Sequence, residues 1–129
     1  MNASREPGSG ALVVGVDLVE IRRVAALAER YGERFTCRVF TPAERMESAH
    51  RPASLAARWA AKEAVVKALG TGFGPVGYRD VELLREGAGQ PELRLHGKAR
   101  ALAEARGLCS WAVSISHDGA YAIAFVIAT

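Results

Sequence analysis

The sequence predicts an α+β protein in which helical segments lie between strands near both ends of the chain. The order of elements indicated by the residues is β-α-α-α-β-β-α-β-β, which lacks the regular strand–helix alternation of α/β folds. The chain has 129 residues, 50% of them hydrophobic and 24% charged, which is the balance of a folded globular protein. We therefore expect a flexible tail over residues 1–10 and one domain over residues 11–129.

The first two expected elements are a strand and a helix. Residues 11–20, ALVVGVDLVE, form a β-branched run that is typical of a buried strand. Residues 21–32 then place apolar side chains at helical spacing. The chain is expected to pass from strand to helix close to Asp17 and Ile21.

Two more helices are predicted in the middle of the chain. Thr41 and Glu44 have the spacing of a capping box, which marks the start of one helix. The other is AARWAAKEAVVKALGTG, residues 56–72, with Ser54 as its expected N-cap. Gly70 stands where a left-handed residue commonly ends a helix.

The second half of the chain is expected to contain four strands and one helix. Residues 80–97 indicate two strands around a glycine-containing turn, and residues 98–107 a short helix that ends at Gly107. The last 19 residues, WAVSISHDGAYAIAFVIAT, alternate in the manner of a hairpin with its turn near Asp118 and Gly119.

The central helix carries four charges in an otherwise apolar setting. At about 100° per residue, Arg58, Lys62, Glu63 and Lys67 lie on both sides of the large apolar stripe. The remaining surface consists of small residues that allow close packing: Ala57, Ala60, Ala61, Ala64 and Ala68. Buried charges cost several kcal/mol unless they are paired, bound to metal or exposed to a cleft. A Glu63–Lys67 pair at i, i+4 is the structural alternative, and a functional site is favoured.

A second carboxylate lies within the first strand. Strand alternation places Asp17 on the opposite face from Val16 and Leu18. Such an aspartate is often only a helix cap. Together with Glu63, however, it suggests a Mg²⁺-assisted phosphate or diphosphate site, because Mg²⁺ is commonly held by one or two carboxylates and substrate oxygens.

Composition restricts the partners and the location of the protein. The net charge of +3 and a pI near 9.2 favour an acidic or phosphorylated partner. We find neither an apolar run of membrane-span length nor the hydrophobic core of a signal peptide, so a cytoplasmic protein without membrane or nucleic-acid partners is expected. No nucleophile-elbow motif or Cys-His-Asn set is visible, so the chain shows no obvious covalent nucleophile.

Five segments together resemble the signatures of the holo-[acyl-carrier-protein] synthase family of 4'-phosphopantetheinyl transferases. They are GVDLVEIRRV, FTPAE, LAARWAAKEAVVKALGTG, DVELL with GQPELRLHG, and VSISHD. The resemblance implies one copy per chain of a fold with an antiparallel-rich sheet against a long central helix. It also implies transfer of phosphopantetheine from coenzyme A to a serine of an apo acyl carrier protein, with release of adenosine 3',5'-bisphosphate. A homotrimer with active sites at subunit interfaces is expected by the same resemblance.

The resemblance also assigns roles to residues. Asp17 and Glu63 match the metal carboxylates, and with Lys67 they are the expected catalytic residues. The matching coenzyme A contacts are Arg58, Lys62, Lys67, Gly70, Gly72, Pro91, Ser116 and His117. The matching contacts to the acidic carrier protein are Arg22, Arg23 and Arg30. Trp59 stands where the family usually has Phe, and we expect it to pack without altering the chemistry.

Several alternatives stay open at this point. By strand alternation His117 shares a face with Trp111, Val113 and Ile115, which also fits a core histidine. The base that takes the serine proton is either Glu63 or a metal-bound water. Two other function classes are a non-catalytic basic module that binds an acidic protein and another Mg²⁺-dependent enzyme that acts on nucleotides. Whether the acceptor serves fatty acid or polyketide synthesis is also open.

Overall fold

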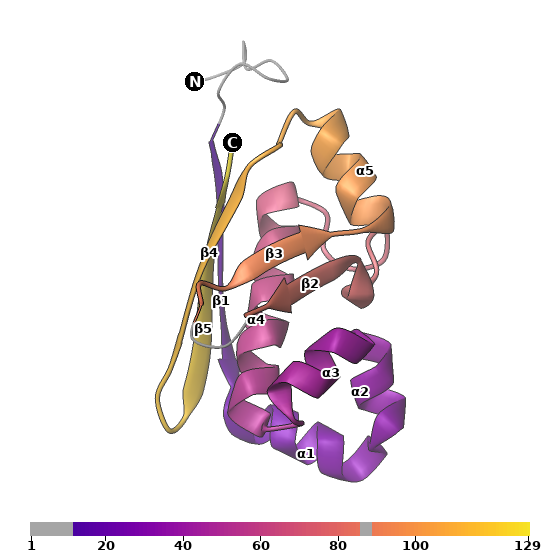
Figure 1. Ribbon diagram of the computed structural model, residues 1–129, viewed down its shortest axis with the longest axis vertical. Coiled ribbons are helices and arrows are strands. Elements are labelled where there is room, and N and C mark those ends of the chain that lie inside the picture. The colour runs from indigo at the N-terminus through magenta and orange to yellow at the C-terminus, as the bar shows by residue number, and fades with distance from the viewer. Residues whose placement is uncertain (1–11, 86–88) are drawn as a thin grey trace.

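The computed structural model describes residues 12–85 and 89–129, and it contains two antiparallel sheets and one long central helix (Figure 1). In chain order the elements are β1 (Val13–Glu20), α1 (Ile21–Tyr31), α2 (Glu33–Val39), α3 (Pro42–Ser48), α4 (Pro52–Leu69), the 3₁₀ turn η1 (Tyr78–Asp80), β2 (Val81–Leu84), β3 (Glu92–Leu95), α5 (Gly97–Ala105), β4 (Trp111–His117) and β5 (Tyr121–Ala128). The α+β class is confirmed. The predicted tail, residues 1–10, lies outside the described residues.

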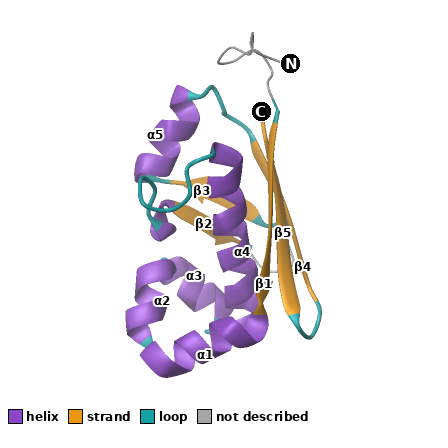
Figure 2. Ribbon diagram, turned by 180° about the vertical axis from the view of Figure 1, so that it is seen from behind, coloured by secondary structure: helices purple, strands orange, loops and turns teal. Residues whose placement is uncertain are grey.

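The larger sheet has the order β1-β5-β4, and all its neighbouring strands are antiparallel. Helix α4 runs along one face of this sheet, whereas α1, α2 and α3 gather at one end and α5 lies at the other (Figure 2). The inward residues of β5 are small: Ala122, Ala124, Val126 and Ala128 are all fully buried. Small side chains on this face let α4 lie close to the sheet.

The closest approach of sheet and helix occurs at Gly15. A Cβ atom at this position would lie 1.9 Å from the backbone oxygen of Ala64 on α4, so only glycine fits there. The alanine-rich side of α4 therefore packs closely, as the sequence predicted. Asp17 lies two residues further along β1 and shares the side of the strand that faces α4.

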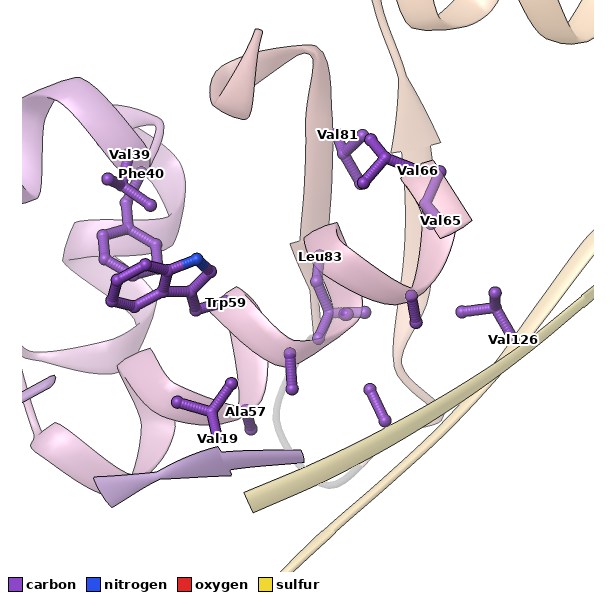
Figure 3. Close-up of a cluster of buried hydrophobic side chains, with 14 of the residues drawn as sticks. Val19, Val39, Phe40, Ala57, Trp59, Val65, Val66, Val81, Leu83 and Val126 are labelled. Atoms are coloured by element: carbon purple, nitrogen blue, oxygen red, sulfur yellow. The ribbon is translucent and has the colours of Figure 1, made fainter. Parts of the chain in front are cut away.

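Helix α4 is covered on its other sides as well. Val81 and Leu83 of β2 pack from one direction and Val126 of β5 from another (Figure 3). The ring of Phe35 lies 5.4 Å from the ring of Trp59, measured between centroids. Of the 18 residues of α4, 12 are buried, so a charged side chain on this helix needs a partner or a cavity.

Two local predictions need correction. Ser54 does not cap α4, because the helix already begins at Pro52, whose fixed φ suits the first helical position. Helix α2 was not predicted; Gly32 separates it from α1 by its positive φ of 55°. Phe35 and Val39 are buried at i, i+4 spacing, and this pair is the signal that could have found the helix.

Several predicted boundaries are confirmed. Thr41 and Glu44 form both hydrogen bonds of the capping box, with N···O distances of 3.0 and 3.2 Å. Gly70 ends α4 in the left-handed conformation at φ 75°. Asp118 accepts hydrogen bonds from two backbone N–H groups in the β4–β5 turn. In the part of the chain that the structure describes, no helix is both long and apolar enough to cross a membrane.

The outer face of the larger sheet is apolar. Six large side chains of β1 and β5 are 40–58% exposed on it: Val14, Val16, Leu18, Tyr121, Ile123 and Phe125. The pairing register sets Val16 opposite Phe125 and Leu18 opposite Ile123. Contiguous exposed apolar surface of this kind marks an interaction site in soluble proteins.

The close contact at Gly15 predicts how substitution of this glycine changes the free energy of unfolding. Gly15→Ala forces a Cβ into the backbone of α4, so we expect the free energy of unfolding to fall by about 3 kcal/mol or more in urea denaturation. The matched control is Gly119→Ala, whose Cβ would meet no atom within 4 Å and should change stability by only about 0.5 kcal/mol. Equal stability of the two variants would refute the close packing of β1 on α4.

Candidate active site

Asp17, Glu63 and Lys67 lie together where β1 crosses α4. The ammonium nitrogen Nζ of Lys67 lies 2.7 Å from Oδ1 of Asp17 and donates a second hydrogen bond, of 3.2 Å, to the carbonyl of Val16. Among the described residues no ion pair joins Glu63 to Lys67, so the helical pair considered from sequence does not form. A cavity of about 230 Å³ lies beside the crossing of β1 and α4. Its lining residues are Asp17, Leu18, Val19, Arg23, Trp59 and Glu63.

The charges in this carboxylate cavity affect one another. Burial raises the pKa of Glu63, and the nearby negative charge of Asp17 raises it further. A hydrogen bond from Trp59 opposes this shift. The hydrogen bond to Asp17 and its charge raise the pKa of Lys67, which keeps that ammonium protonated. A bound cation would stabilise the ionised form of two neighbouring carboxylates of this kind.

The described residues contain no group of three or more His, Cys, Asp or Glu side chains that could hold a metal. Asp17 and Glu63 could therefore supply only part of a coordination shell. This number of protein ligands fits Mg²⁺, which keeps several waters and commonly takes its other ligands from substrate phosphates.

A second cavity, of about 530 Å³, lies on another side of α4 and contains three predicted coenzyme A contacts: Arg58, Pro91 and His117. The guanidinium of Arg58 is buried and pairs with Glu47, while its Nε atom is buried without a hydrogen-bond partner among the described residues. Because His117 is exposed at this cavity, the core-histidine alternative is wrong. Arg51 and Arg85 also line the cavity, and the sequence analysis did not identify them. We call it the basic cavity.

The two cavities have no lining residue in common. Arg58 and Lys67 are nine residues apart on α4, which places them on opposite sides of a helix. Gly70 and Gly72 follow the Lys67 end of the helix, with φ values of 75° and 66°. Ser116 pairs with Ile123 in the sheet register and is exposed, so strand alternation directs it to the outer face of the sheet.

Lys62 lines neither cavity. Its side chain is 0% exposed, and its ammonium donates to Oε1 of Glu44 at 2.7 Å, to the carbonyl of Tyr78 at 3.1 Å and to the carbonyl of Val81. These three acceptors use all three N–H groups of the ammonium. The prediction that Lys62 contacts coenzyme A is therefore replaced by a structural role, because the buried ion pair encloses its charge.

The predicted partner-binding arginines are divided between two places. The guanidinium of Arg23 lies over the ring of Trp59 at 5.4 Å and lines the carboxylate cavity. Arg22 and Arg30 are exposed on α1, and Arg30 lies over the ring of Tyr31 at 5.3 Å. A groove of about 450 Å³ opens beside them between α1, α2 and α4. Its lining residues are Leu27, Tyr31, Arg34, Phe35, Arg38, Val39, Trp59 and Tyr78, and we call it the α1–α2 groove.

The model of the 4'-phosphopantetheinyl transferase superfamily matches residues 13–126, which shows that the chain has the fold of this class of enzyme. A holo-[acyl-carrier-protein] synthase of Gloeobacter violaceus is 50% identical over 117 residues, which cover 88% of this chain and 89% of the relative. The chain therefore belongs to the holo-[acyl-carrier-protein] synthase family of that superfamily.

Solved structures agree with this assignment. The crystal structure of Helicobacter pylori holo-[acyl-carrier-protein] synthase in complex with coenzyme A is 29% identical, with a TM-score of 0.81 over 90% of this chain and 99% of that one. The synthase–coenzyme A complex of Chronobacterium ammoniagenes is 39% identical, with a TM-score of 0.78 over 92% of this chain and 97% of that one.

The buried ion pair between Lys62 and Glu44 predicts a large loss of stability when one partner is removed. Lys62→Met removes the partner of a buried carboxylate, so we expect the free energy of unfolding to fall by about 3–5 kcal/mol. Replacing Glu44 by Gln in the same chain should recover part of this loss, because no buried charge is then left unpaired. Lys67→Met removes a pair whose lysine is half exposed, and it should cost about 1 kcal/mol or less. Urea denaturation of the variants measures all three values, and equal losses for Lys62→Met and Lys67→Met would contradict the structural role of Lys62.

Proposed function

We propose that this chain transfers the 4'-phosphopantetheine group from coenzyme A to a serine of an apo acyl carrier protein and releases adenosine 3',5'-bisphosphate. The observation that best supports the proposal is the carboxylate cavity, where Asp17 and Glu63 from separate elements meet beside the ammonium of Lys67. Membership of the synthase family and the coenzyme A in two similar structures support the same substrate.

Asp17 and Glu63 are the proposed ligands of a Mg²⁺ ion. When bound, the ion supplies Lewis-acid polarisation of the diphosphate and stabilises charge on the leaving bisphosphate. Lys67 is charged and half exposed beside Asp17, so its ammonium can neutralise a phosphate oxygen bound next to this carboxylate. Glu63 takes the serine proton either directly or through a water.

The basic cavity is the proposed site of the nucleotide end of coenzyme A. Arg58 and His117 line it together with Arg51 and Arg85, and guanidinium groups pair well with phosphates. Pro91 adds an apolar surface on which an adenine can lie. Gly70 and Gly72 lie at the other end of α4 and are the proposed phosphate contacts beside Lys67. The backbone N–H of Gly70 already bonds to the carbonyl of Lys67, so the proposed N–H donor of this turn is that of Gly72.

We also propose that three copies of the chain assemble with an active site at each interface. The apolar outer face of the larger sheet has the character of a surface buried between subunits. Assembly also supplies what one chain lacks, because the carboxylate cavity and the basic cavity lie on different sides of α4. In the proposed trimer, the carboxylates of one subunit face the basic cavity of its neighbour.

The α1–α2 groove is the proposed docking surface for the carrier protein. It combines an apolar floor, which includes Leu27 and Phe35, with the guanidinium groups of Arg34 and Arg38. This pattern suits an amphipathic acidic helix, whose apolar side enters the groove while its carboxylates meet the arginines. Arg30 extends the positive surface, and Arg23 connects it to the carboxylate cavity.

Removal of either carboxylate tests the proposed reaction. Asp17→Ala and Glu63→Ala should each abolish phosphopantetheine transfer and leave the fold intact, because each removes one proposed Mg²⁺ ligand from the edge of a cavity rather than from the core. The assay incubates the chain with coenzyme A, Mg²⁺ and an apo carrier protein and weighs the acceptor by mass spectrometry. Consumption of coenzyme A without an acceptor would indicate a hydrolase instead. Binding of the carrier protein without transfer by the wild-type chain would indicate a non-catalytic module.

Charge reversal in the groove tests docking. Arg34→Glu should raise the KM for the carrier protein at least several-fold with little change in the KM for coenzyme A, because Arg34 lines the groove and neither cavity. The difference should shrink as ionic strength rises to physiological values. Arg100→Glu is a matched control on the exposed surface of α5, where it only breaks a surface pair with Glu104. Equal effects of the two variants would remove the groove from the docking model.

A further inference from the structure

Trp59 is the one residue that lines both the carboxylate cavity and the α1–α2 groove among the described residues. Its indole Nε1–H donates a hydrogen bond of 3.2 Å to Oε1 of Glu63, one helical turn further along α4. Only 8% of Trp59 is exposed, so the donor stays in a partly desolvated setting. The residue therefore does more than fill the core.

The indole is held from several directions. The ring of Phe35 lies 5.4 Å away, and the ring of Tyr78 approaches edge-on at 6.5 Å. The guanidinium of Arg23 lies over the indole at 5.4 Å. The backbone carbonyl of Tyr78 in turn accepts from the buried ammonium of Lys62. A ring packed in this way cannot rotate freely, so its N–H has a fixed direction.

A glutamate has three side-chain torsions, and its two carboxylate oxygens are equivalent until one of them is engaged. The bond from Trp59 engages Oε1, and among the described residues no hydrogen bond reaches Oε2. Both the torsions and the choice of oxygen are thereby restricted before any ligand binds. Restriction of this kind reduces the conformational entropy lost when a carboxylate binds a cation.

We propose that Trp59 is a positioning residue for Glu63, which holds Oε1 through the indole N–H and leaves Oε2 for the metal and the reacting groups. The inference rests on the proposed function, because it assumes that Glu63 acts as the metal carboxylate. A phenylalanine at this position would keep an aromatic ring in the core but would lose the donor. Trp59→Phe is consequently the variant that separates positioning from packing.

The hydrogen bond itself can be tested without catalysis. The chain has two tryptophans, Trp59 and Trp111, so a ¹H–¹⁵N spectrum contains two indole signals, and Trp111→Phe assigns them. Glu63→Gln should move the Trp59 signal upfield and speed its exchange with solvent, because an amide oxygen is a weaker acceptor than a carboxylate. The Trp111 signal should stay in place. An unchanged Trp59 signal in folded Glu63→Gln would overturn the proposal.

A separate experiment measures how the loss of the indole N–H changes the affinity for a metal ion. Binding of Mn²⁺ in the presence of coenzyme A is measured by the electron paramagnetic resonance of free Mn²⁺. The affinity should fall about tenfold in Trp59→Phe, which is the lower end of the loss expected when the outer-shell partner of a metal ligand is removed. In transfer assays kcat should fall by a similar factor while the KM for coenzyme A stays within about twofold. Trp111→Phe should change none of these values.

Three outcomes separate the inference from its premise. Normal Mn²⁺ binding and a normal kcat in Trp59→Phe would overturn the positioning role, even if the wild-type chain transfers phosphopantetheine. A loss of activity that only follows a lower melting temperature, with unchanged Mn²⁺ affinity in the folded fraction, would also overturn it. Absence of transfer by the wild-type chain would refute the proposed function, and the indole signals would still report the bond between Trp59 and Glu63.

Discussion

The contact between the backbone of β1 and the backbone of α4 at Gly15 determines the arrangement of the site. A strand can approach a helix this closely only where it has no side chain, and Ala64 is the small residue that meets it. Asp17 follows Gly15 on the same side of β1, while Glu63 and Lys67 flank Ala64 on α4. The distance between strand and helix therefore sets the distance between the carboxylates.

Helix α4 carries four charged residues, and each has a different environment because the helix is covered by different elements around its axis. Lys62 is enclosed with Glu44, a residue of α3, and serves the core. Arg58 pairs with Glu47 at the basic cavity, whereas Lys67 pairs with Asp17 at the carboxylate cavity. One helix thus connects two sites that lie on opposite sides of it. This geometry gives a reason for an oligomer, since a neighbouring copy can bring the two kinds of site together.

Local patterns predicted much of the fold, and they singled out Asp17 and Glu63, which line one cavity in the structure. The capping box at Thr41 and the left-handed Gly70 depend on neighbouring residues only, so both could be identified from sequence. Asp17 became a candidate site residue because placing a carboxylate in an apolar strand is costly. The partner of Lys62 could not be identified in this way, because Glu44 is 18 residues away and meets it only through the packing of α3 on α4. Likewise, the hydrogen bond from Trp59 to Glu63 depends on a ring orientation that Phe35 and Tyr78 impose from other elements.

The division of the active site between neighbouring subunits is most directly tested by mixing two inactive chains. One chain carries Asp17→Ala, and the other carries Arg58→Ala together with His117→Ala, so each lacks a different half of the proposed site. After the two chains are unfolded together and refolded as a mixture, transfer to an apo carrier protein should return to about a quarter of the wild-type rate, because that share of random interfaces combines two intact halves. A mixture that remains as inactive as its components would show that each active site belongs to a single chain, and it would contradict the account.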